Sequence, residues 1–126
     1  MEIERSKFEE LVASALDDLP EEFKRALENI EVVVEDEPSS DVLMERKIKP
    51  PDTLLGLYHG VPLSKRGQGY VNPLYAGVLP DKVSIYQKPI QSVCRTRAEL
   101  KRRVQEVVMH EIGHYFGMSE EQLEEI

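Results

Sequence analysis

Apolar residues recur at helical spacing in two parts of the chain. Residues 3–19 place apolar side chains three and four positions apart, which predicts an amphipathic helix. Pro20 then begins a second short helix that extends to about Asn29, because proline is tolerated in the first turn of a helix. The longest helical pattern begins at Arg97 and extends to about Phe116, which corresponds to a helix roughly 30 Å long.

The C-terminal helix carries signals for its start and its end. Thr96 followed by Glu99 forms a capping box, in which the threonine side chain accepts a hydrogen bond from a first-turn backbone N–H. Gly117 follows the last apolar position, and glycine readily adopts the positive φ that ends many helices. A second capping box, Ser119 followed by Gln122, predicts a short terminal helix after this stop.

Runs rich in β-branched or alternating apolar residues predict up to four strands. These runs are residues 30–34, 42–48, 53–59 and 82–90. Pro89 restricts the last run to a strand end or a sheet edge, because proline cannot donate a ladder hydrogen bond. Residues 60–80 contain four of the seven glycines and three of the eight prolines, so a long loop is predicted there.

Length and composition favour one small soluble domain. The 126 residues, 40% of them hydrophobic, can bury one core, so a single domain spanning 1–126 is expected. The only cysteine, Cys94, excludes an internal disulfide and is typical of a reducing compartment. No apolar run approaches the roughly 18 residues that cross a bilayer, and no signal peptide pattern is present. A cytoplasmic protein without membrane contact is therefore expected.

The net charge of −8 is distributed unevenly. Residues 1–45 hold 15 acidic and 4 basic side chains, whereas residues 46–103 hold 3 acidic and 12 basic ones. The basic middle could attract an acidic partner such as RNA. Basic and acidic surfaces lying side by side in one small domain are the more common arrangement, so no nucleic-acid partner is expected.

The chemistry of the chain is concentrated in the pattern H-E-x-x-H, formed by His110, Glu111 and His114. Four residues of an α-helix turn about 400°, so the two imidazoles lie on one face and can reach the same Zn²⁺. Glu111 is rotated about 100° from His110, which lets its carboxylate reach a water molecule on that ion. The pattern thus supplies two ligands and a base, as hydrolysis by metal-activated water requires.

A catalytic zinc site usually has three protein ligands, so one further donor is needed. Glu120 is the candidate, because Gly117 lets the chain leave the helix and fold back toward the metal. The neighbouring Glu121 is the alternative ligand. Both residues also fit the first turn of the predicted terminal helix, where acidic side chains are favourable.

The sequence HEIGHYFGMSEEQL resembles the zincin metallopeptidases, and specifically the small bacterial minimal zincins, whose motif is H-E-x-x-H-x-x-G-x-x-D. The resemblance continues through TLLGLYHGVPL, DKVSIYQKPI and CRTRAEL, and it covers roughly residues 53–123. It implies an α+β fold of two layers, in which a small mixed sheet packs on the long active-site helix. Together with the two N-terminal helices, this is the expected architecture.

The resemblance also implies roles for the motif residues. His110, His114 and Glu120 would hold one zinc ion, and Glu111 would be the catalytic base. Glu120 departs from the aspartate of the family motif by one methylene, which leaves the third ligand and the metal affinity open. Side chains that could assist as a second oxyanion stabiliser are Tyr58, His59, Tyr86 and Tyr115.

These residues predict a zinc-dependent metallopeptidase that acts on a peptide or protein substrate. One alternative is a non-catalytic zinc-binding or adaptor domain, because the chain is short for a peptidase with a deep specificity pocket. The other is a metal-dependent ribonuclease, which does not account for a glutamate directly after the first histidine. Substrate specificity and oligomeric state are not determined by the sequence.

Overall fold

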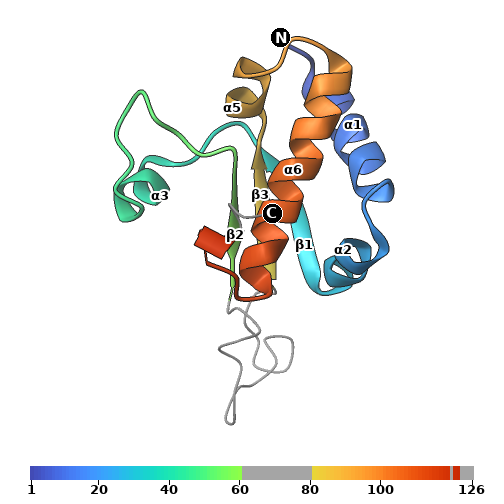
Figure 1. Ribbon diagram of the computed structural model, residues 1–126. Coiled ribbons are helices and arrows are strands. Elements are labelled where there is room, and N and C mark those ends of the chain that lie inside the picture. The colour runs from blue at the N-terminus through green and yellow to red at the C-terminus, as the bar shows by residue number, and fades with distance from the viewer. Residues whose placement is uncertain (61–80, 120, 123–126) are drawn as a thin grey trace.

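The structure, a computed structural model, describes residues 1–60, 81–119 and 121–122. A three-stranded sheet lies at its centre, with helix α6 packed across one face and helices α1 and α2 beside α6 (Figure 1). The elements are α1 (Arg5–Asp17), α2 (Glu21–Ala26), the 3₁₀ turn η1 (Leu27–Asn29), β1 (Ile30–Glu35), α3 (Ser40–Glu45), β2 (Gly56–His59), β3 (Asp81–Tyr86), α5 (Gln87–Ser92) and α6 (Arg97–Tyr115). The long loop predicted over residues 60–80 lies outside the described residues except for Gly60.

The sheet is mixed, with the strand order β1-β3-β2. Strand β3 pairs in parallel with β1 and antiparallel with β2, so β2 is an edge strand of the described sheet. The predicted α+β fold is therefore confirmed: a small mixed sheet, a long helix packed on it, and two N-terminal helices. No helix within the described ranges is long and apolar enough to cross a membrane.

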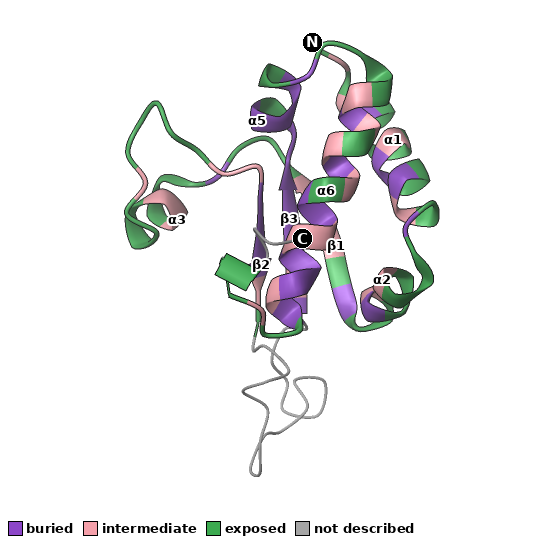
Figure 2. Cartoon of the chain, in the orientation of Figure 1, coloured by how far each residue is buried: buried purple, intermediate pink, exposed green. Residues whose placement is uncertain are grey.

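The core forms where α6, α1 and one face of the sheet meet. Fully buried side chains come from all three, and they include Phe8, Val83, Ile85, Val108 and Ile112. Strands β2 and β3 are buried along most of their length, whereas α1 and α3 present many exposed positions (Figure 2). Burial of the strands against α6 places the last turns of that helix directly over β2.

The strand predicted over residues 42–48 is wrong, because Ser40–Glu45 forms helix α3. The side chain of Ser39 accepts a hydrogen bond of 3.1 Å from the backbone N–H of Val42 and so caps the first turn. Asp41 adds a favourable negative charge in that turn. A local cap thus outweighs the β propensity of the apolar residues that follow.

The strand predicted over residues 82–90 extends too far. Strand β3 ends at Tyr86, and Gln87 begins helix α5. Pro89 lies in the first turn of α5, where the missing backbone N–H has no intrahelical partner to lose. The proline therefore marks a helix start and not a sheet edge.

Candidate metal centre

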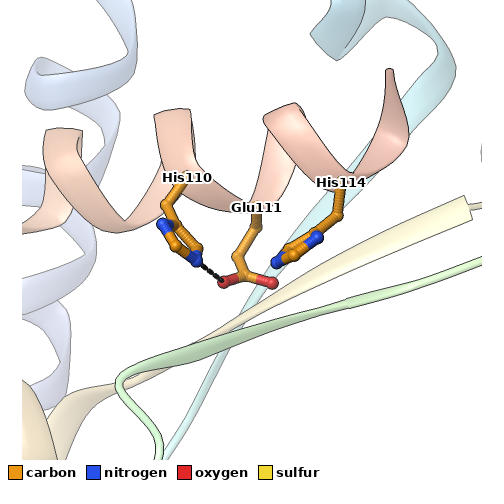
Figure 3. A group of neighbouring side chains, drawn as sticks. All are labelled: His110, Glu111 and His114. Atoms are coloured by element: carbon orange, nitrogen blue, oxygen red, sulfur yellow. Dashed lines mark ion pairs between the residues drawn. The ribbon is translucent and has the colours of Figure 1, made fainter. Parts of the chain in front are cut away.

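His110, Glu111 and His114 lie on the last two turns of α6, and their side chains point to the same side of the helix, toward strands β2 and β3 (Figure 3). One ligand atom from each residue lies within 4.8 Å of the other two. The imidazole centroids of the two histidines are 5.1 Å apart, and the ring planes meet at 79°. The structure therefore brings together the three residues of the H-E-x-x-H pattern in a group that could hold a metal ion.

The carboxylate of Glu111 lies between the backbone of strand β2 and the imidazole of His110. Its side chain lies between the two imidazoles, and the residue is only 8% exposed (Figure 3). Oε1 accepts a hydrogen bond of 2.9 Å from the backbone N–H of Tyr58 on strand β2. Oε2 lies 4.0 Å from Nε2 of His110. The strand thus orients one oxygen, and the other lies toward His110 (Figure 3).

The end of α6 fixes the orientation of His114. Gly117 has φ +89°, and the backbone N–H groups of Gly117 and Met118 donate to the carbonyls of His114 and Gly113 at 2.9 Å each, a Schellman motif. This turn brings the Met118 carbonyl to 3.2 Å from Nδ1 of His114. A carbonyl only accepts hydrogen bonds, so Nδ1 carries the proton. Nε2 is then the nitrogen that can bind a metal ion.

The predicted third ligand, Glu120, lies outside the described residues. The capping box around it is present, because Ser119 N donates to Gln122 Oε1 at 2.8 Å and Gln122 N donates to Ser119 Oγ at 3.3 Å. The alternative ligand, Glu121, is exposed at this short turn. The choice between the two glutamates remains a prediction.

The four candidate oxyanion stabilisers do not lie on the same side of the sheet. Tyr58 faces α6: its ring packs edge-on against Tyr115 with centroids 6.1 Å apart, and its hydroxyl donates to Asp81 Oδ2 at 2.8 Å. Because side chains alternate along a strand, His59 and Tyr86 project from the opposite face. Of the four, Tyr58 and Tyr115 therefore lie on the side of the metal-binding group.

His59 is placed away from the two motif histidines. Its Nε2 lies 3.3 Å from Ser84 Oγ, a fully buried hydroxyl. Burial, together with the nearby Lys82 ammonium, lowers the pKa of His59 below its usual value. Its position makes His59 the natural reference for testing which imidazoles bind metal.

Gly56 sets the spacing between β2 and the metal-binding group. A Cβ at this position would lie 2.4 Å from Val107 Cγ1 on α6 and 3.0 Å from the Ser84 carbonyl oxygen. It would also lie 3.7 Å from Glu111 Cγ. The H-E-x-x-H motif does not reveal this residue, although a glycine inside a strand pattern signals a close backbone approach.

Gly56→Ala is expected to destabilise the fold by about 1–3 kcal/mol, because the added methyl overpacks the contact between β2 and α6. Thermal or urea unfolding measures the change. In Gly56→Ala/Val107→Ala the closest clash is removed, so the double variant should be more stable than the sum of the two single changes predicts. A single variant within about 0.5 kcal/mol of the wild type would contradict this account of Gly56.

A family model described as zincin-like metallopeptidase matches residues 27–126 of the chain. No curated protein matches this chain. Among solved structures, a conserved hypothetical protein from Thermus thermophilus is similar, with 22% sequence identity and a TM-score of 0.57. The alignment covers 90% of this chain and 94% of that protein. At this identity the likeness supports the fold alone.

Proposed function

This chain belongs to the zincin-like metallopeptidase family, and we propose that it hydrolyses peptide bonds in a peptide or protein substrate with one zinc ion. The observation that carries the proposal is the convergence of His110, Glu111 and His114 at the end of α6. Two imidazoles one helical turn apart are donors that catalytic zinc sites use, and the carboxylate between them is in place to act as the base.

The side chains present fit a zinc ion. The two histidines lie one helical turn apart, and the Met118 carbonyl presets the tautomer of His114 that leaves Nε2 for the metal. Glu120 is the proposed third ligand from its spacing after the histidines. When bound, zinc supplies Lewis acidity that lowers the pKa of water toward 7 and stabilises negative charge on the carbonyl oxygen.

Glu111 is proposed as the general base. Its Oε2 would take a proton from the attacking water and then deliver it to the amine that leaves when the peptide bond breaks. Tyr58 N–H donates to Oε1 at 2.9 Å and so fixes the position of the carboxylate. Strand β2 thereby orients the base before a substrate arrives.

The proposal is tested by incubating the zinc-loaded protein with a mixed-sequence peptide library. Cleavage is expected, together with its loss after treatment with a chelator and its return when zinc is added back. Mass spectrometry of the products measures all three. A zinc-loaded protein that cleaves no peptide would instead support the non-catalytic zinc-binding domain.

A further inference from the structure

A buried side-chain contact joins the end of β2 to the start of β3. The hydroxyl of Tyr58 donates a hydrogen bond of 2.8 Å to Oδ2 of Asp81, and both residues are buried, with exposed fractions of 7% and 6%. Tyr58 pairs with Val83 in the antiparallel ladder, so Asp81 is its diagonal neighbour on the face of the sheet that α6 covers. Burying a carboxylate is unfavourable unless it is hydrogen-bonded, and the contact with Tyr58 offsets part of that cost.

The backbone of Gly60 closes over this contact. A Cβ at position 60 would lie 2.5 Å from Oδ1 of Asp81 and 2.8 Å from the hydroxyl oxygen of Tyr58. Glycine thus lets the main chain approach both polar side chains closely. The two side chains are therefore confined on this side, and any larger residue at position 60 would displace one of them.

Tyr58 connects this contact to the proposed base. Its backbone N–H donates to Oε1 of Glu111 at 2.9 Å, and its ring packs edge-on against Tyr115, the residue that follows His114. Strand β2 has only four residues and is an edge strand of the described sheet, and the ends of such strands open readily. Asp81 therefore fixes the part of β2 on which the orientation of Glu111 depends.

The same contact determines what the Tyr58 hydroxyl can do. A phenol has a single proton to donate, and Tyr58 donates it to Asp81. Stabilising an oxyanion requires a donor that points at the developing charge. In this arrangement Tyr58 therefore acts through its position and not as the oxyanion donor.

We propose that Asp81 is a positioning residue for the base: through the Tyr58 hydroxyl it holds the Tyr58 N–H in place on Glu111. Its kinetic consequence rests on the proposed peptidase function, whereas the coupling of the three residues can be measured without turnover. Among the described residues, the group that could hold a metal ion does not include Asp81. Losing the contact should therefore misplace the base and lower kcat while zinc stays bound.

The first test is amide hydrogen exchange of the zinc-loaded protein, followed by NMR. Tyr58→Phe keeps the ring and the backbone but removes the hydroxyl, so the amide at position 58 should exchange about three- to tenfold faster, the factor that one net hydrogen bond corresponds to. The amide of Val108, in the buried face of α6, reports global opening and is the reference. Asp81→Ala should act like Tyr58→Phe. Asp81→Asn should stay near the wild type, because its amide oxygen can still accept the hydrogen bond.

Ser84→Ala is the matched control. Ser84 Oγ lies 3.3 Å from Nε2 of His59, so this pair also links β2 to β3 through side chains, but on the opposite face of the sheet. Its loss should leave kcat and the exchange at position 58 unchanged. If both contacts merely stabilised the sheet, Ser84→Ala and Tyr58→Phe would have the same effect.

The second test is steady-state kinetics on a cleaved peptide, with metal analysis of the same samples. Tyr58→Phe and Asp81→Ala should each lower kcat about tenfold and keep their zinc. The double variant Tyr58→Phe/Asp81→Ala should be no slower than Asp81→Ala, because the two side chains act through one contact. Circular dichroism checks the fold. The double variant replaces Tyr58→Phe in both tests if the buried carboxylate that has lost the hydroxyl prevents folding.

The outcomes separate the inference from the function on which it rests. The inference would be overturned, with the peptidase proposal left standing, by unchanged exchange at position 58 in Tyr58→Phe, by an equal increase in Ser84→Ala, by equal effects of Asp81→Asn and Asp81→Ala, or by an unchanged kcat. If the wild type cleaves no peptide, the proposed function fails. The exchange rates then decide by themselves whether Asp81 holds Tyr58 on Glu111.

Discussion

Glu111→Gln is expected to keep its zinc and to lose peptide hydrolysis by a factor of about 10²–10⁴. Glutamine has the size of glutamate, and its amide oxygen can still accept the hydrogen bond from Tyr58 N–H. The amide cannot take a proton from water, so the base is removed while the geometry is kept. Steady-state kinetics on a cleaved peptide, with metal analysis of the same sample, measures both effects.

Glu10→Gln provides the matched control for this change. Glu10 lies on α1, is exposed and pairs with Lys7, so the same loss of one carboxylate should leave hydrolysis and zinc content unchanged. If Glu111→Gln retains more than about a tenth of the wild-type activity, a different group is the base.

His114→Ala and His110→Ala are each expected to weaken zinc binding more than about 100-fold, and to abolish hydrolysis with it. Loss of a residue that only hydrogen-bonds to a ligand typically lowers metal affinity about 10–100-fold, so loss of the ligand itself should lower it further. Competition titration against a chromophoric chelator measures the affinity.

His59→Ala is the control for the two ligand variants, since it removes an imidazole from the opposite face of the sheet. Its zinc affinity should stay near that of the wild type. If His59→Ala weakened zinc binding as much as His114→Ala, the assignment of the two motif histidines would be wrong.

Helix α6 is the part of the molecule that local sequence signals predict best. Thr96 caps its start, accepting a hydrogen bond of 3.1 Å from Glu99 N, and Gly117 ends it with a positive φ. Such signals act within one turn of the chain, so they can be found without knowledge of the fold. The histidine spacing is local in the same sense, because helix geometry alone brings two imidazoles to one face.

The surroundings of Glu111 could not be predicted in this way. Its hydrogen bond to Tyr58 joins residues 53 positions apart, and the close approach of Gly56 to Val107 depends on how β2 lies across α6. Neither contact has a local signature. The wrong strand at 42–48 has a related cause, since a run of apolar residues does not show whether a preceding Ser39 will cap it as a helix.

The most direct test of the central claim is the zinc content of the purified wild-type protein and of His110→Ala, measured side by side by elemental analysis after dialysis against metal-free buffer. The wild type should hold about one zinc ion per chain, and His110→Ala should hold close to none. Near-equal zinc content in the two proteins would contradict a metal centre built on His110 and His114.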